Sequence, residues 1–159
     1  MSDTPTAQPA TPAVAANDTI VRFGFPATLV ADYAHWQVLL RPAQPTLGSL
    51  ILAAKSDAIA FSALPTDAFA ELARVSADIE SVLRRLVAYE KLNYLMLMMV
   101  DPHVHFHVIP RYSGSRTACG LTITDSGWPK TPDLGAAINL DTTQVETLSQ
   151  WLTAQWPTA

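Results

Sequence analysis

Three of the four histidines in this 159-residue chain fall within five residues, at His103, His105 and His107. Polar and apolar residues alternate strictly from 103 to 108, and Pro102 and Pro110 bracket the run. A period of two predicts a β-strand whose side chains point to opposite faces in turn. We therefore expect three imidazoles in a row on one face. Because unperturbed histidine titrates at about 6.5, such a row suggests chemistry near neutral pH.

The geometry of a strand limits what this row can bind. At a rise of about 3.3 Å per residue, the Cα atoms of His103 and His107 lie about 13 Å apart. Zinc–nitrogen bonds are only about 2.0–2.1 Å long, so three histidines cannot share one ion without bending the strand. No cysteine pair or HExxH pattern supports a metal site. An extended anion such as a phosphate chain suits the row better, and we expect neither a metal nor a cofactor.

The central histidine is the best candidate nucleophile, because it has a histidine on each side. Neutral imidazole can attack phosphorus, and protonated imidazole donates hydrogen bonds to phosphate oxygens. His103 and His107 would orient His105, contact the phosphate or hold the tautomer that attack requires. Two alternatives stay open, a structural strand with solvated histidines and a metal-dependent hydrolase that uses two of them.

Several polar residues near the run could contact a phosphate. Ser49 could donate to a phosphate oxygen, although an ordinary turn serine explains it equally well. Arg111 lies just past the histidines and could neutralise a phosphate, as could Arg41 and Arg116. A solvated arginine at a strand end is the commoner case for each. We take Ser49 and Arg111 as the candidate substrate-binding residues.

The composition narrows the class of protein. The length suits one domain with a substantial core, and 49% of the residues are hydrophobic while 15% are charged. A net charge of −4 without a basic run argues against a nucleic-acid binder. The single cysteine cannot form an internal disulfide, and no apolar stretch of about 18 residues could span a membrane. With no signal-peptide pattern, we predict a cytoplasmic protein that binds neither nucleic acid nor membrane.

Local patterns predict the elements that must position the histidines. A long helix is expected from Thr66, its N-cap, because apolar residues recur at helical spacing as far as Leu86. A last helix should start near Asp141, where Gln144 completes a capping box. The expected strands are residues 20–25, 36–40, 50–54, 94–100, 103–108 and 121–124. The 94–100 and histidine strands should pair antiparallel, while residues 1–18, rich in Ala, Pro and Thr, form a disordered tail.

The pattern His-φ-His-φ-His-φ-φ at residues 103–109, followed by Pro110-Arg111, resembles the histidine triad (HIT) superfamily of nucleotide hydrolases and transferases. The predicted elements upstream follow in the family's order, so the resemblance covers roughly residues 35–112. It implies an α+β fold, a five-stranded antiparallel sheet with helices packed on it, and pairing as a homodimer. We expect a HIT-like domain at 19–112 and a C-terminal helical extension at 113–159 packed on the same domain.

The resemblance also implies a two-step reaction on a nucleotide. His105 would attack the α-phosphate and form a covalent nucleotidyl-histidine, from which water or another acceptor releases the nucleoside monophosphate. His107 would contact the phosphate, and His103 would help to fix His105. Dinucleoside polyphosphates or adenylated amines are the implied substrates. A nucleotide-binding module with weak or lost catalysis is the alternative.

The sequence departs from the family pattern at three places. Val100-Asp101-Pro102 leads directly into His103, where members of the dinucleoside polyphosphate branch usually carry a Gly-Gln loop. Ser49, after Gly48, stands where a fourth histidine is often found. Leu40 stands where an asparagine often helps to hold the ribose. These departures bear on the substrate more than on the nucleophile.

Overall fold

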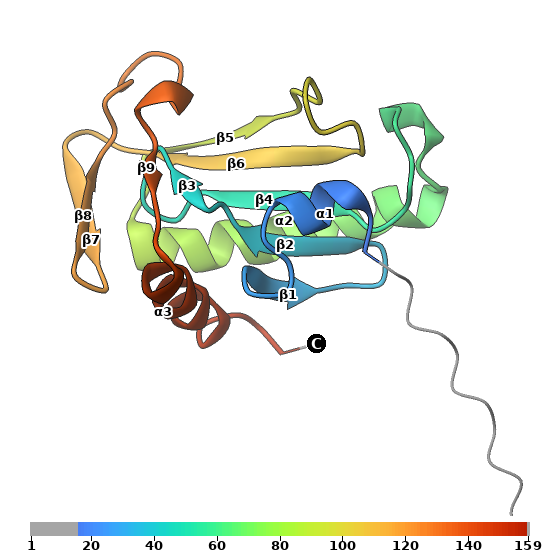
Figure 1. Cartoon of the computed structure of the whole chain (residues 1–159), viewed down its shortest axis with the longest axis horizontal. Helices are drawn as coiled ribbons and strands as arrows, with labels where there is room; N and C mark the ends of the chain where they lie inside the picture. Colours follow the sequence, from blue (N-terminus) through green and yellow to red (C-terminus); the bar gives the residue numbers. More distant parts are fainter. Residues whose placement is uncertain (1–15, 159) are drawn as a thin grey trace, which may run out of the picture.

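A five-stranded antiparallel sheet forms the centre of this computed structural model, which describes residues 16–158 (Figure 1). Its strands lie in the order β1-β2-β4-β6-β5. They are β1 (Leu29–Asp32), β2 (Trp36–Leu40), β4 (Leu50–Ala54), β5 (Lys91–Leu95) and β6 (His105–Arg111). His107 on β6 pairs with Ile51 on β4 and with Leu95 on β5. The histidine strand therefore lies inside the sheet, with one neighbour on each side.

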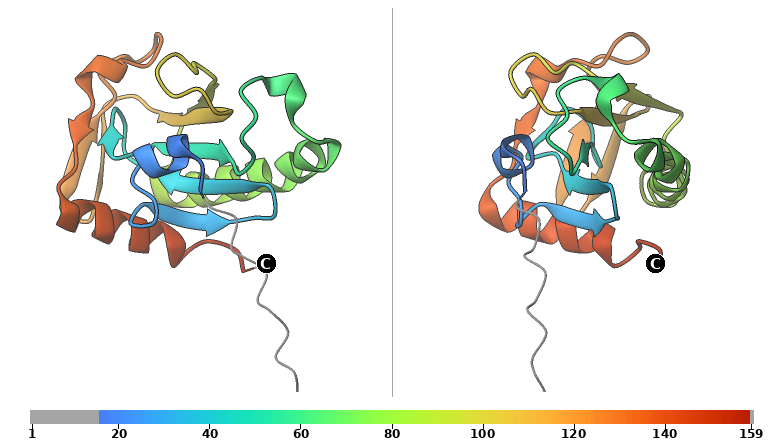
Figure 2. Two further views of the ribbon diagram at one scale, coloured as in Figure 1. Left: turned by 45° about the vertical axis from the view of Figure 1, so that its right-hand side comes forward. Right: turned by 90° about the vertical axis from the view of Figure 1, so that its right-hand side faces the viewer.

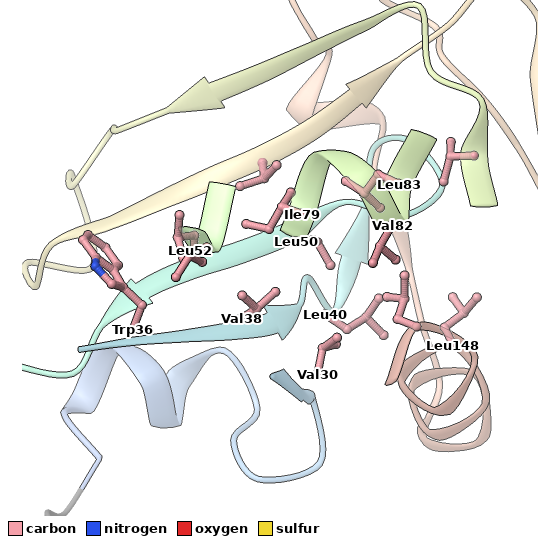
Figure 3. Packing of buried hydrophobic residues seen from close by; sticks show 14 of the residues in the cluster. Val30, Trp36, Val38, Leu40, Leu50, Leu52, Ile79, Val82, Leu83 and Leu148 are labelled. Carbon is pink, nitrogen blue, oxygen red and sulfur yellow. The ribbon is translucent and has the colours of Figure 1, made fainter. Parts of the chain in front are cut away.

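One long helix, α2 (Thr66–Val87), packs on the face of the sheet opposite the histidines. Alternate residues of β2, β4 and β6 point toward α2, because neighbouring strand residues face opposite sides. The buried cluster between them includes Val108 of β6. Figure 3 shows other members of the cluster, among them Val38, Leu50, Leu52, Ile79 and Leu83. Each fully buried aliphatic side chain contributes about 1.5–3 kcal/mol to folding. The predicted helix is confirmed, although its N-cap is Pro65 and not Thr66, so no side chain caps it.

A short helix, α1 (Asp18–Arg22), lies across the other face of the sheet, as the right-hand view of Figure 2 shows. The predicted strand at 20–25 is therefore wrong. The Asn17 side chain accepts a hydrogen bond from the N–H of Ile20 and caps the helix. Asn17 also donates to the carbonyls of Ala54 and Ser56, which ties α1 to the end of β4. The predicted tail falls on residues 1–15 outside the described residues, and its last residues, 17 and 18, belong to the helix start.

The two strands that flank the predicted turn at Asp101-Pro102 have shifted bounds. β5 ends at Leu95 and β6 begins at His105, so residues 96–104 form a connection where a strand at 94–100 was predicted. Met98 in this connection has a φ of 48°, a left-handed conformation that cannot continue a strand. Met96 and Met98 still pack against the core, but Met99 and Val100 are 87% and 77% exposed, so the end of the apolar run lies at the surface. The antiparallel pairing of β5 with β6 is confirmed.

The C-terminal third of the chain adds small elements and one helix. They are β7 (Ser115–Ala118) paired with β8 (Leu121–Thr124), β9 (Ile138–Asn139) paired with β3 (Ala43–Gln44), the 3-10 turn η2 (Leu134–Ala136) and α3 (Thr142–Thr153). Another 3-10 turn, η1 (Phe61–Ala63), precedes α2. The capping box of Asp141 and Gln144 starts α3 as predicted, and Leu148 and Leu152 join the core. The predicted fold class, a five-stranded antiparallel sheet with packed helices and a C-terminal helix, is confirmed. Among the helices that the structure describes, none has the length and apolar character to span a bilayer.

Candidate active site

Two of the three clustered histidines lie side by side on the sheet face that α1 covers. His105 and His107 are two residues apart on β6, and their ring centroids are 5.1 Å apart. His103 precedes β6, so two of the three expected imidazoles lie on the strand itself, and the third reaches α1 from the connection before it. The Nδ1 atom of His103 lies 2.9 Å from the Thr19 hydroxyl on α1, which also accepts the backbone N–H of His103. The first histidine is thus held by the short helix.

One hydrogen bond decides the tautomer of His105. Its Nδ1 atom lies 2.7 Å from the carbonyl oxygen of His103. A carbonyl oxygen can only accept, so Nδ1 must carry the proton that it donates. In the neutral ring the other nitrogen, Nε2, then holds a free lone pair. The Nε2 atom of His105 is therefore free to accept a proton or a hydrogen bond, or to attack an electrophile.

His107 is held in the opposite tautomer by Arg41. The Nε–H of Arg41 donates to Nδ1 of His107 over 3.3 Å. Because arginine only donates, Nδ1 must accept, and the proton of the neutral ring lies on Nε2. Burial lowers the pKa of His107 to about 4, with further lowering by the charges of Arg41 and His105, while Asp101 opposes. His107 is therefore a neutral hydrogen-bond donor at pH 7.

Arg41 is a candidate site residue whose contact with His107 could not be predicted from the sequence. It follows β2 directly, and its backbone N–H donates to the carbonyl of Ser49, so it continues the residue parity of Leu39. That parity puts its side chain on the histidine face, whereas Leu40 points into the core on the α2 side. Another nitrogen of the guanidinium donates to the carbonyl of Ala43, and burial lowers the arginine's pKa. The alternation of residues along β2 could have predicted which face of the sheet Arg41 lies on. It could not have predicted which group the guanidinium contacts.

The short helix also closes the site. The Phe23 ring centroid lies 5.5 Å from that of His105 and 5.8 Å from that of His107. Ile20 packs with residues of β2 and β4 in a second apolar cluster beside the histidines. Arg22 on α1 forms an ion pair of 3.0 Å with Asp101 in the connection before β6. Under this cover His105 is 1% exposed and His107 is 7% exposed.

The two predicted substrate-binding residues are engaged elsewhere. Ser49 is fully buried, and its hydroxyl donates to the carbonyl of Thr46 over 2.8 Å. Arg111 is 3% exposed and forms a two-bond ion pair with Asp125, at 2.7 and 3.2 Å. A further bond of 2.9 Å runs from Arg111 to the side-chain oxygen of Asn93. Neither side chain is brought to the two histidines.

The described part of the chain brings no third metal ligand to the two histidines. Over residues 16–158, no group of three or more histidine, cysteine, aspartate or glutamate side chains is arranged to hold a metal ion. A metal-dependent site built on His105 and His107 would therefore need a ligand from outside these residues.

The chain is similar to solved structures of histidine triad proteins. One from Bradyrhizobium japonicum matches with a TM-score of 0.68 and 21% identity over 91% of this chain and 99% of its own. One from Sinorhizobium meliloti matches with a TM-score of 0.65 and 20% identity over 89% of this chain and 96% of its own. A diadenosine triphosphate hydrolase from Plasmodium falciparum matches with a TM-score of 0.60 and 10% identity over 81% and 76%. No family model and no curated protein sequence matches the chain.

These likenesses define the class: the chain has the fold of the histidine triad proteins. The resemblance first carried by the histidine run is thereby confirmed at the level of the fold. Within that fold, Arg41 lies beside His107 in this protein. The short helix α1 and the Phe23 that follows it cover His105 and His107.

Proposed function

We propose that this protein is a nucleotidyl hydrolase or transferase that acts at an α-phosphate through a covalent intermediate on His105. The observation that carries the proposal is the opposite tautomers of two adjacent rings. His105 offers a lone pair at Nε2, and His107 offers a proton at Nε2. A nucleophile and a hydrogen-bond donor side by side are what phosphoryl transfer through a histidine requires.

The first step forms one bond and breaks another at phosphorus. Nε2 of His105 attacks the α-phosphate, and the leaving group departs with the electron pair of its bond to phosphorus. A polyphosphate leaves as an anion, whereas an amine takes a proton from solvent and leaves as the neutral molecule. The ring becomes a cation, and its Nδ1–H remains donated to the His103 carbonyl, which stabilises that charge. Nε2–H of His107 donates to a phosphate oxygen. Arg41, held at the same ring, adds positive charge where negative charge develops.

The second step releases the nucleotide. Water, or another acceptor hydroxyl, attacks the phosphorus and the P–N bond breaks. The bonding pair returns to Nε2 of His105, and the proton of the attacking water passes to solvent. His105 ends in the tautomer with which it began, so the cycle closes.

Access to the nucleophile requires movement of α1. His105 is 1% exposed beneath Phe23, so a nucleotide reaches Nε2 only when this cover shifts. The helix has five residues, and its Arg22–Asp101 ion pair is at a partly exposed site, where such pairs contribute little. Dinucleoside polyphosphates and adenylated amines are the proposed substrates. A homodimer and a cytoplasmic location complete the proposal and rest on the sequence.

A product assay with a trapped intermediate tests the proposal. The protein is incubated with diadenosine triphosphate and with adenosine 5′-phosphoramidate, and released AMP is measured. Acid quenching followed by mass spectrometry should find an AMP adduct on His105. His105→Ala should abolish turnover and adduct, while His35→Ala, which removes the histidine outside the run, should retain both.

Three results would overturn this reading. Equal turnover by His105→Ala and wild type would exclude His105 as the nucleophile. Tight nucleotide binding by calorimetry without turnover or adduct would support the alternative of a non-catalytic nucleotide-binding module. Stoichiometric zinc, together with loss of activity on chelation, would support a metal-dependent hydrolase.

A further inference from the structure

A cavity of about 520 Å³ opens on the same sheet face as the histidines, at the outer edge of the sheet. Lys91, Asn93 and Leu95 of β5 form its floor together with Arg111 of β6. The register pairs Leu95 with His107 and Lys91 with Arg111, and paired residues of antiparallel strands share a face. Leu95, at one end of the floor, is therefore the strand neighbour of His107, and the rest of the floor continues along the sheet away from His105.

The lining of this cavity offers positive charge, a donor and an aromatic ring. Its five remaining lining residues belong to the segment 128–132, which includes Trp128 and Lys130. No carboxylate lines the cavity, and neither Lys91 nor Lys130 makes an ion pair among the described residues. The Asn93 side-chain oxygen accepts from Arg111, which leaves the amide nitrogen as a donor. In a chain of net charge −4, this is a local excess of positive charge.

The wall that carries Trp128 is fixed to the histidine strand. Asp125, which is paired with Arg111, also accepts the backbone N–H of Gly127 over 3.2 Å. The turn after Gly127 closes tightly, because an added Cβ there would lie 2.3 Å from the carbonyl oxygen of Thr131. The backbone N–H of Lys130 donates to the carbonyl of Gly127 over 2.8 Å. The backbone that carries Trp128 and Lys130 is therefore held in a tight turn beside β5.

We propose that this cavity binds the leaving group of the reaction, and that this leaving group is a nucleoside polyphosphate. The inference rests on the proposed function and selects dinucleoside polyphosphates over adenylated amines. Strand positions 107 and 111 are about 13 Å apart, a span that accommodates phosphates followed by a nucleoside. The two lysines would neutralise the phosphates, the Asn93 amide would donate to an oxygen, and a base would stack on Trp128.

In the first step of the proposed reaction, the P–O bond that breaks gives its electron pair to the leaving group. When Nε2 of His105 bonds to the α-phosphorus, the P–O bond to the next phosphate breaks. The departing oxygen keeps the electron pair and leaves as a nucleoside diphosphate or longer anion. Cations in the cavity stabilise that anion as it forms. An ammonia leaving group, by contrast, has neither charge nor ring to place there.

A selectivity ratio tests the cavity. We would compare kcat/KM for diadenosine triphosphate with that for adenosine 5′-phosphoramidate in wild type and in a double variant, Lys91→Ala with Lys130→Ala. The ratio should fall at least tenfold in the double variant. Lys55→Ala, which removes a lysine paired with Asp32 elsewhere on the molecule, should leave the ratio as in wild type. A double-variant ratio within twofold of wild type would overturn the proposal.

A binding measurement separates this proposal from the proposed function. If wild type hydrolyses neither substrate, the catalytic proposal fails, but the cavity is still tested by calorimetry with ADP. ADP affinity should fall at least fivefold in the double variant and stay unchanged in Lys55→Ala. Equal ADP affinity in wild type and the double variant would exclude the cavity as a nucleoside polyphosphate site.

Discussion

His107 should stay neutral down to about pH 4, because its pKa is lowered to about 4. Removal of the positive charge of Arg41 should raise the pKa of His107. Burial is the largest cause that lowers the pKa of His107, followed by the charges of Arg41 and His105, with Asp101 in the 96–104 connection opposing them. Arg41→Met removes the charge and the donated bond but keeps most of the aliphatic length. The pKa of His107 should then rise, yet remain below 6.5, because burial persists.

The size of the effect follows from proton linkage. The unfolded chain binds this proton with a pKa of about 6.5, and the folded protein with a pKa of about 4. Between these values the unfolded state holds more protons, so the free energy of unfolding falls as the pH falls. Linkage gives a loss of about 2 kcal/mol between pH 7 and about pH 5 from this group alone. Partial solvent access to the site reduces this to about 1–2 kcal/mol.

Two measurements check this prediction. An NMR titration of the histidine ring resonances gives the pKa of His107 in wild type and in Arg41→Met. Urea denaturation at pH 7 and near pH 5 gives the loss of stability, and His107→Asn should reduce that loss by about 1–2 kcal/mol. A wild-type His107 that titrates near 6.5 would refute the reasoning. An unchanged or lower pKa in Arg41→Met would show that Arg41 does not set the state of the ring.

Three further substitutions probe the supports of the site. Asp125→Ala leaves the Arg111 guanidinium buried without its partner, and urea denaturation should show a loss of about 3–5 kcal/mol; a loss below about 1 kcal/mol would contradict this. Gly48→Ala combines a φ of 84° with a contact of 2.9 Å from the added Cβ to a helix side chain, so the unfolding free energy should fall by about 1–3 kcal/mol. Gly114→Ala, with a φ of 73° and open space, should lower the unfolding free energy by less in the same urea denaturation. Thr19→Val removes the hydroxyl that holds the first histidine, so kcat should fall about fivefold with KM little changed, and Thr19→Ser should restore it.

The elements that the sequence predicted correctly are those whose defining pattern lies wholly within a short stretch of residues. The alternation through the histidines indicated a strand, and β6 covers most of it. Apolar residues at helical spacing indicated α2 over several turns. The capping box at Asp141 fixed the start of α3, because both of its hydrogen bonds join residues three positions apart.

Short apolar runs were assigned incorrectly, because they lack enough turns of periodicity to separate helix from strand. Residues 20–25 became a helix when Asn17 capped it and bonded to the end of β4. The strand predicted at 94–100 stopped at Leu95, the last residue of β5 that pairs with β6, and Met98 beyond it takes a left-handed conformation. Both outcomes depend on contacts with distant strands.

The chain by itself determined that histidines would alternate along a strand in a histidine triad fold, because that pattern is local. Only the tertiary structure decided which ring nitrogens carry protons. The partner of His107 is Arg41, 66 positions away, and the first histidine bonds to Thr19, 84 positions away. The same holds for the pairing of Arg111 with Asp125, which also accepts the backbone N–H of Gly127 at the wall of the cavity. A hydrogen-bonding side chain takes whichever partner the fold brings within reach, and no local pattern records that choice.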